Sequence, residues 1–328
     1  VALVFSAIGG SALGAQEFEL LASFDNPPLG PFGGLAVGPD GLYGVAWGGT
    51  WDNGSVFRFD PAEAGTGEVV KLYSFRDDHP IEGLSRPYYG LVRASDGHFY
   101  GMREGRNWDG VPPTAVYRVS SAGDYQTVYA FEQRSQGIGP TGPLVEVDGE
   151  LWGTCWSGGE PEFDGTVFKV TTGGVFDRVH AFSGGVDGSR PEGGLAFRPH
   201  DGLLYGTTSL GGAEDLGTIF SIDPATGELE TMYDFSSATD SSVPMGQLTV
   251  APDGLIYGAL THANPSFRSC GQVFRFDPEV PGAGISVVRG FLCSGDVTKF
   301  PRGGMVVHDG YLYGVTLGDT LPGREADQ

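Results

Sequence analysis

Basic residues are scarce in this sequence: 19 lysines and arginines stand against 41 aspartates and glutamates, which gives a formal net charge of −22 at pH 7. Such a field repels phosphate backbones and anionic lipid headgroups, so neither nucleic acid nor a membrane surface is an expected partner. We interpret the acidic excess as solvated surface that keeps an exported protein soluble, with a cation-loaded surface as the alternative.

Long apolar runs and familiar catalytic motifs are missing as well. No stretch of about twenty apolar residues occurs, so the sequence predicts no transmembrane segment. It has no G-x-S-x-G, no phosphate-binding glycine loop and no H-E-x-x-H, and its six histidines lack metal-ligand spacing. A facing pair of carboxylates for glycoside chemistry stays open among so many acids. We therefore assign no catalytic residue and no cofactor, and expect a protein that is not an enzyme.

Glycine and proline, in contrast, are abundant. The 328 residues include 56 glycines and 22 prolines, which is too many for a helical protein and suits many short strands joined by tight turns. A single domain of this length is common among all-β barrels, sandwiches and propellers. We expect one all-β domain over residues 1–328 with almost no helix.

An internal repeat runs through the chain in three ladders of aromatic residues. The first ladder is an aromatic-glycine pair that follows an Asp-Gly or similar turn, with spacings of 52 to 57 residues: Tyr43, Tyr100, Trp152, Tyr205, Tyr257 and Tyr313. The second ladder lies in segments such as TVFKV: Phe57, Tyr117, Phe168, Phe220 and Phe274. The third ends segments such as KLYSF: Phe75, Phe131, Phe182, Phe235 and Phe291.

Each repeat unit predicts four short strands, of the types GGLAV, LYGTT, TVFKV and KLYSF. Apolar and polar residues alternate in them, and the Asp-Gly pairs supply the positive φ that tight hairpins need. Four strands in about fifty residues are typical of a β-propeller blade, whereas a stacked β-solenoid, the alternative, usually has a shorter period. The sequence predicts a six-bladed β-propeller with four-stranded blades of about 52–57 residues.

The repeat resembles a known family. The run D-G-x-L-Y-G-T-T-x-x-G-G, then G-T-V-F and L-Y-x-F, is clearest over 201–220 and 165–182 and is similar to the GloVer tandem repeats of exported bacterial "choice-of-anchor" proteins. This resemblance implies export and, often, attachment to the cell surface. It implies no catalytic residues, and the chain shows no C-terminal sorting motif or hydrophobic tail that would match the anchor.

The repeat phase predicts that the two ends of the chain together supply the sixth blade. The sixth unit has its first two strands only, while Phe5 lies 52 residues before Phe57 and Phe24 lies 51 before Phe75. We therefore expect EFELLASF, ending at Phe24, to be the fourth strand of a closing blade shared by both ends, which removes exposed strand edges. Residues 1–15 are either the third strand of that blade or the remnant of a signal peptide cut before Gln16.

Three cysteines carry one further prediction. Cys270 and Cys293 flank a hairpin, and a register that pairs Phe274 with Arg289 places them opposite each other. We predict a disulfide between them, which favours an oxidising compartment. Cys155 has no adjacent histidine, so we interpret it as a small buried residue.

The segments between the second and third strands vary most and supply the candidate ligand residues. Four tryptophans at or near them are candidates for stacking on sugar rings, with packing between blades as the alternative: Trp47, Trp51, Trp108 and Trp156. Four aspartates are weak calcium candidates, with turn-stabilising roles as the favoured interpretation: Asp52, Asp109, Asp164 and Asp215.

Three function classes follow from the sequence. We favour a non-catalytic scaffold or interaction module outside the cell or on its surface, whose partners are other surface proteins, glycans or copies of itself. The alternatives are a propeller that binds or cleaves carbohydrate and a subunit of an extracellular filament built through shared blades. The predicted fold does not choose among them, because propellers host enzymes and binders alike.

Overall fold

The computed structural model describes residues 6–8, 31–46, 52–60, 69–76, 86–104, 114–237, 243–261, 269–280, 282, 284–292 and 298–318. This part of the chain is almost entirely β-structure, as the sequence predicts, and its single helix is one 3₁₀ turn, η1 (Arg134–Gln136). Within these ranges no helix has the length and apolar character needed to cross a membrane.

Five of the repeat units each form an antiparallel four-stranded sheet whose strands follow one another in chain order. Sheet 1 contains β2 (Pro31–Gly38), β3 (Gly41–Ala46), β4 (Asp52–Phe59) and β5 (Val69–Arg76). Sheet 2 contains β6 (Arg86–Arg93), β7 (Phe99–Glu104), β8 (Ala115–Val119) and β9 (Tyr125–Ala130). Sheet 3 contains β10 (Ile138–Val147), β11 (Glu150–Ser157), β12 (Thr166–Thr171) and β13 (Phe176–Ala181). Sheet 4 contains β14 (Leu195–Arg198), β15 (Leu203–Thr208), β16 (Thr218–Ile222) and β17 (Leu229–Asp234). Sheet 5 contains β18 (Thr249–Val250), β19 (Ile256–Leu260), β20 (Ser269–Phe276) and β21 (Ile285–Leu292).

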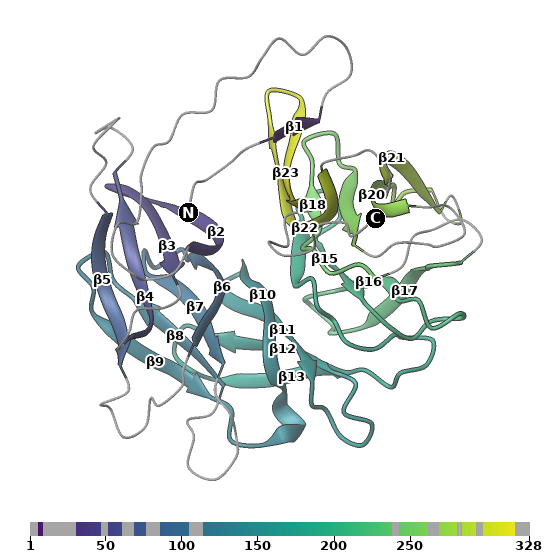
Figure 1. The fold of residues 1–328 in the computed structure, drawn as a ribbon. Helices are drawn as coiled ribbons and strands as arrows, with labels where there is room; N and C mark the ends of the chain where they lie inside the picture. The colour runs from purple at the N-terminus through teal and green to yellow at the C-terminus, as the bar shows by residue number, and fades with distance from the viewer. Residues whose placement is uncertain are drawn as a thin grey trace, which may run out of the picture.

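A sixth sheet joins the two ends of the chain. It contains β22 (Thr298–His308), β23 (Tyr311–Gly318) and, beside β23, the N-terminal strand β1 (Ser6–Ile8). The sheets succeed one another with their first strands toward the middle of the molecule and their fourth strands outside (Figure 1). The first strands of neighbouring sheets touch from β2 through β6, β10, β14 and β18 to β22. The described chain is therefore an all-β, propeller-like arrangement of sheets.

The register of β1 corrects one detail of the sequence prediction. The ladders place Phe5 in phase with Phe57, which pairs with the glycine Gly44 of the second strand. In the sixth sheet, Ser6 is instead the partner of the equivalent Gly314. The strand is therefore displaced by one residue from the predicted phase, and a one-residue shift exchanges the two faces of a strand. Phe5 and the predicted strand EFELLASF lie outside the described residues.

The aromatic-glycine pair of each second strand has a steric reason. Gly206 is the cross-strand partner of Phe220, and a Cβ on Gly206 would lie 2.4 Å from Cζ of that ring. The phenyl ring thus occupies the volume that a side chain would need. The same pairing recurs in the other four complete sheets: Gly44 with Phe57, Gly101 with Tyr117, Gly153 with Phe168, and Gly258 with Phe274.

In four of the five complete sheets the turn between the first and second strands is held by a hydrogen bond from the ladder tyrosine to the turn aspartate, whereas the third has Trp152 in that place. The Tyr205 hydroxyl donates to Asp201 at 2.8 Å, and Tyr100 donates to Asp96 at 2.7 Å. Burial, and then the hydrogen bond to Asp96, raises the pKa of Tyr100 to about 12. These tyrosines therefore stay neutral at physiological pH and serve the turn rather than proton transfer.

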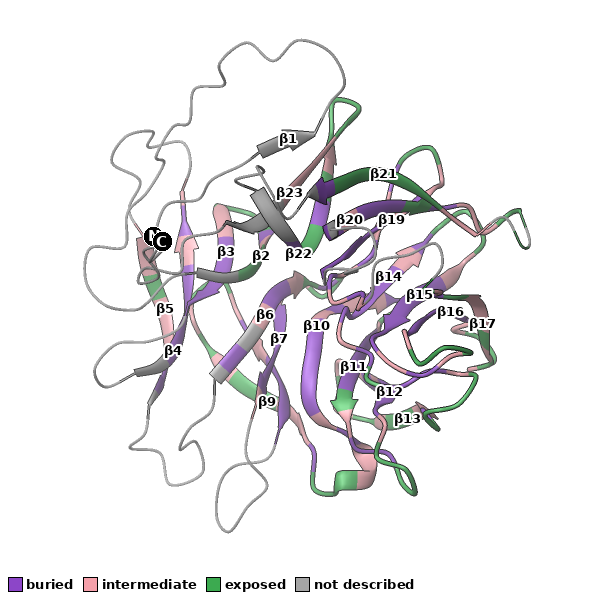
Figure 2. Ribbon diagram, turned by 45° about the vertical axis from the view of Figure 1, so that its right-hand side comes forward, coloured by how far each residue is buried: buried purple, intermediate pink, exposed green. Residues whose placement is uncertain are grey.

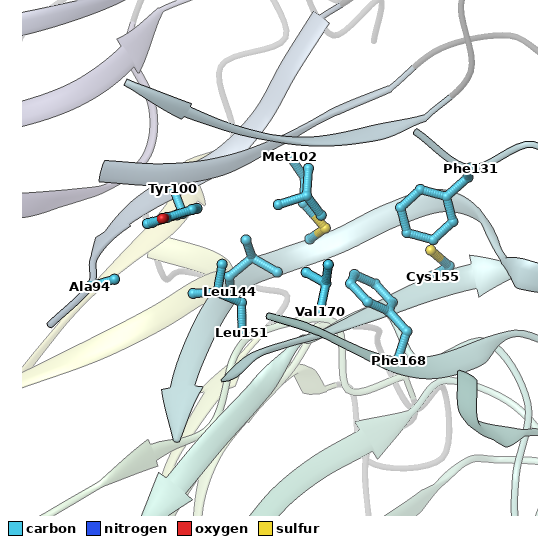
Figure 3. Close-up of a cluster of buried hydrophobic side chains, with 10 residues drawn as sticks. Ala94, Tyr100, Met102, Phe131, Leu144, Leu151, Cys155, Phe168 and Val170 are labelled. Carbon is cyan, nitrogen blue, oxygen red and sulfur yellow. The ribbon is translucent and has the colours of Figure 1, made fainter. Parts of the chain in front are cut away.

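The hydrophobic core lies between neighbouring sheets. One cluster combines Tyr100, Met102 and Phe131 of the second unit with Leu144, Leu151, Cys155, Phe168 and Val170 of the third (Figure 3). Comparable clusters join the first unit to the second, the third to the fourth and the fourth to the fifth. Figure 2 shows inner strands such as β10 largely buried, whereas β21 at the outside is mostly exposed. Because each repeat buries its apolar face against the next, no single repeat has a complete core of its own.

Candidate functional site

The two ends of the sheets differ in character. Antiparallel succession brings the first and third turns of every unit to one end, and it brings the segments after the second and fourth strands to the other. We call the second of these the loop end; in the third and fourth units it carries residues 157–165, 183–190 and 209–217. The short Asp-Gly turns repeat from unit to unit, but the loop-end segments differ in length and composition. Loops on a rigid scaffold are where binding residues usually lie, so this end is the candidate site.

Trp156 is the one tryptophan candidate that lies among the described side chains. It is 40% exposed near the end of β11. A Cβ on Gly139 would fall 1.8 Å from its Nε1, so the indole lies directly against the backbone of β10. The guanidinium carbon of Arg190, from the following unit, is 5.9 Å from the centre of the ring. Trp47, Trp51 and Trp108 lie outside the described residues.

The segment after Trp156 is a compact turn held by its own backbone. The Phe163 N–H donates to the Gly159 carbonyl at 2.7 Å, and the Gly165 N–H donates to the Gly158 carbonyl at 2.9 Å. The Ser157 hydroxyl adds a bond to the Phe163 carbonyl at 3.2 Å. The Phe163 side chain is 42% exposed. Two exposed aromatic rings therefore belong to one well-braced segment.

The aspartate candidates that are described have local hydrogen-bond partners. Asp164 accepts a bond from the Ser189 hydroxyl at 2.7 Å, which ties the loop of the third unit to the start of the fourth. Asp215 accepts the Gly211 N–H at 2.7 Å within its own segment. Asp52 begins β4 but its side chain is outside the described set, as is Asp109. Across the ranges that the structure describes, no three histidine, cysteine or acidic side chains gather closely enough to hold a metal ion.

The hairpin that carries Cys270 differs in register from the sequence prediction. Phe274 pairs with Val287 and Val273 pairs with Arg289, because bulges interrupt the ladder between β20 and β21. Nearer the predicted bridge, Ser269 and Leu292 are partners, so this register does not place Cys270 directly opposite Cys293. Cys270 is disulfide-bonded. Cys293 lies outside the described residues, so its role as the partner stays a prediction.

Cys155 is a free and fully buried thiol. Burial raises its pKa to about 12, against a smaller opposing effect of a hydrogen bond with Thr166. A thiol that stays protonated at neutral pH is a poor nucleophile. The side chain packs with Phe168 and Phe131 in the core between the second and third units (Figure 3).

A buried arginine that the repeat pattern did not single out joins the fourth and fifth units at the opposite, turn end. Arg198 is 2% exposed, and its Nε donates to the Gly254 carbonyl at 2.8 Å. Its two terminal nitrogens donate to Asp201 at 2.5 Å and to Glu279 at 2.6 Å. One sequence signal could have revealed Arg198: the equivalent positions of other units hold small residues, for example Ala94 and Ala251.

The charges around Arg198 shift the ionisation of its partners. Burial alone would raise the pKa of Asp201, but hydrogen bonds from the Leu203 N–H, the Tyr205 hydroxyl and Arg198 outweigh it and lower that pKa. The hydrogen bond from Arg198, followed by the charge of His200, lowers the pKa of Glu279. Both carboxylates are therefore held ionised, and the cluster acts as an electrostatic link between units.

Comparison with protein-family models shows the origin of the repeat. The model described as the Gloeobacter/Verrucomicrobia repeat matches residues 11–198 and 112–321. The chain belongs to this family. No curated protein sequence matches it.

Solved structures place this Gloeobacter/Verrucomicrobia repeat protein among propeller-type folds. A gluconolactonase of Xanthomonas campestris matches with a TM-score of 0.51 at 14% identity, over 88% of this chain and 84% of that one. A xyloglucanase of the same organism matches with a TM-score of 0.55 at 15% identity, over 86% of this chain but only 43% of the xyloglucanase. At such low identity the likeness concerns the fold alone.

Proposed function

We propose that this repeat protein is a six-bladed β-propeller that serves as a non-catalytic interaction module outside the cell or at its surface. Its partners are other surface proteins, glycans or further copies of the chain. The six blades are the five four-stranded sheets together with a sixth that both chain ends complete. Five successive contacts between first strands, and the pairing of β1 with β23, support this count.

An exposed strip on β21 supports closure of the sixth blade by the N-terminal segment. In the first four units, the residue three positions before the third-ladder phenylalanine packs in the hydrophobic cluster between that unit and the next. These residues are Leu72, Val128, Val179 and Met232. The next unit's fourth strand contributes its first residue to the same cluster: Tyr125, Phe176, Leu229 and Ile285. Val288 holds the corresponding place on β21 and is 43% exposed. The residue in phase to cover it is Phe18, six residues before Phe24.

The functional proposal rests on a difference between the repeated and the variable residues: the first build the scaffold, and the second are exposed at the loop end. The residues that recur in every unit are engaged in the scaffold: glycines lie under rings, phenylalanines pack against the next unit, and aspartates hold turns. The variable residues gather at the loop end, where Trp156, Phe163 and Arg190 are exposed. A constant frame that presents a variable surface is the usual design of a binding scaffold.

Two hydrolytic activities test the non-catalytic part of the proposal. The structurally similar proteins are named as a gluconolactonase and a xyloglucanase, so glucono-δ-lactone and xyloglucan are the substrates to offer the purified chain. We expect no turnover above the uncatalysed rate with either. Turnover that is saturable and lost on heat denaturation would make the protein an enzyme and overturn this part of the proposal.

The location is tested on intact cells of the source organism. A non-permeant biotinylation reagent should label the protein on washed cells or in the medium, but should not label a cytoplasmic marker enzyme. Labelling that requires cell lysis would contradict an extracellular module, whatever the result of the turnover assays.

A further inference from the structure

The loop end of the third and fourth units carries a small surface with two partly exposed aromatic rings and an exposed arginine. It consists of Trp156, Phe163 and Arg190, and we call it the Trp156 platform. Trp156 and Phe163 are 40% and 42% exposed, which is unusual for aromatic side chains in a chain whose ladder aromatics in the third and fourth units are fully buried. Arg190 is also exposed and lies over the indole ring.

The platform is rigid, because both units hold it by hydrogen bonds. The Arg190 N–H donates to the Asp164 carbonyl at 2.7 Å, and the Arg190 carbonyl accepts the Ser209 N–H at 3.0 Å. The Ser189 hydroxyl donates to the Asp164 carboxylate at 2.7 Å. The backbone of Gly139 lies against Nε1 and Cδ1, on the pyrrole side of the Trp156 indole. A partner that binds here would meet a preformed surface and would not have to order it.

Backbone strain marks two of the three residues. Arg190 has φ of 56° and Phe163 has φ of 64°, a region that is unfavourable for a non-glycine residue. The preceding unit has a glycine at the equivalent position. Gly139 precedes Pro140 as Arg190 precedes Pro191, and Gly139 has φ of 64°. Glycine would satisfy the backbone at position 190 without strain. Val243 holds the same place before Pro244 with φ of 68°, so the positive φ belongs to this position of the repeat, and the arginine is one of several side chains found there.

We propose that the Trp156 platform binds a neutral pyranose residue of a glycan. The apolar C–H face of a sugar ring stacks on an indole, and the ring hydroxyls accept hydrogen bonds from a guanidinium. Hydroxyls can also donate to carboxylates, and Glu160 and Glu162 are exposed in the same turn. A net charge of −22 disfavours a polyanionic glycan, so the ligand is neutral. This assignment rests on the proposed interaction role and names its partner class.

The test uses the full-length chain and three neutral oligosaccharides, the cello-, manno- and xylo-hexaoses, with oligogalacturonate as the acidic comparison. Isothermal titration calorimetry and the intrinsic tryptophan fluorescence report binding. We expect at least one neutral hexaose to bind, W156A to weaken it at least about tenfold, and W156F to retain part of the affinity. Y311A, which removes an exposed ring (47% exposed) from β23, is the matched control and should bind as the wild type does.

R190G separates a binding role from a structural one. The glycine relieves the positive φ, so the melting temperature should stay the same or rise while the saccharide affinity falls. A lowered melting temperature with unchanged affinity would make Arg190 a structural residue and remove it from the site. Absence of binding by all three neutral hexaoses, equal binding by W156A and the wild type, or binding of oligogalacturonate alone would overturn the proposal. The turnover and labelling experiments test the proposed non-catalytic, extracellular role, and their results do not depend on whether the platform binds a saccharide.

Discussion

The ring of Phe182 meets the ring of Phe220 edge-on, with centroids 5.3 Å apart and an interplanar angle of 62°. Phe182 follows the fourth strand of one unit, and Phe220 lies in the third strand of the next. The same edge-to-face contact recurs at centroid distances of 5.1 to 5.8 Å: Phe75 with Tyr117, Phe131 with Phe168, and Phe235 with Phe274. This contact joins successive sheets and explains why the second and third ladders consist of aromatic residues.

Truncation of Phe182 should be among the most destabilising changes in the chain. Phe182→Ala removes a ring that is 1% exposed and leaves a cavity between two units, which costs roughly 3–5 kcal/mol of unfolding free energy. Equilibrium urea unfolding followed by circular dichroism measures the loss. Val186→Ala, at a side chain that is 80% exposed, is the control and should be nearly neutral. Equal effects of the two variants would contradict the role given to the contact.

A single methyl group at Gly206 should also destabilise the protein. Gly206→Ala would place its Cβ 2.4 Å from the Phe220 ring, so the ring must move within a packed core, at a cost of about 1–3 kcal/mol. Gly173→Ala is the matched control, because the nearest atom to its new Cβ, Oγ1 of Thr171, is at 3.7 Å. The midpoint of urea unfolding should shift for the first variant only. If both variants keep the wild-type midpoint, the second-strand glycines are not sterically required.

The link through Arg198 predicts a dependence of stability on pH. The folded state lowers the pKa of Asp201 and of Glu279, so both contribute stability above the ordinary carboxyl pKa of about 4, and this contribution is lost as pH falls through the lowered values. Arg198→Met should cost roughly 2 kcal/mol near pH 7, and the difference from the wild type should shrink below about pH 4. Urea midpoints measured from pH 7 to pH 2.5 give both quantities.

Arg118 supplies the control for that experiment. It lies on β8, and its terminal nitrogen donates to the neutral amide of Gln126 at 2.6 Å rather than to a carboxylate. Arg118→Met should therefore change stability little, and by the same amount at every pH. A pH-independent loss in Arg198→Met as well would show that packing of the arginine stem, and not charge, holds the two units together.

Closure of the sixth blade predicts a specific cross-link. If Phe18 covers Val288, the double variant Phe18→Cys with Val288→Cys should form a new disulfide on oxidation, detectable as a cross-linked peptide after proteolysis. An intramolecular bond in a monomer indicates a blade that closes on its own chain. A ladder of cross-linked oligomers indicates blades shared between molecules. Each single variant is a control, and failure of both products in the double variant would contradict this pairing.

The predicted bridge between Cys270 and Cys293 should appear as one disulfide-linked peptide pair in a non-reducing digest of protein purified from the cell exterior. The loop it closes is short enough that reduction should cost about 3 kcal/mol of unfolding free energy in the chain-entropy model. Cys155 should remain unmodified by alkylating reagents until the protein is unfolded, because it is fully buried. A Cys155 that reacts rapidly in the native protein would contradict its place in the core.

The three ladders predicted most of the local structure, because the residues that favour a strand or a turn act on their near neighbours in the sequence. An aromatic next to a glycine in the second strand and a phenylalanine at or just past the end of the fourth suffice to place the strands of the first five units. The register of the β20–β21 hairpin was predicted less well. Its bulges move Arg289 opposite Val273 rather than Phe274, and nothing in the local alternation signals such a bulge.

The sequence by itself determined the repeat, the all-β class, the four strands of the first five units and the turns between them, since hydrophobic alternation and Asp-Gly pairs act over a few residues. Only the tertiary structure decided which side chains of different units meet. The contact of Arg190 with Trp156, the reach of Arg198 to Glu279 and the pairing of β1 with β23 join residues distant in the chain. Their geometry depends on how whole sheets pack against one another, which no local pattern encodes.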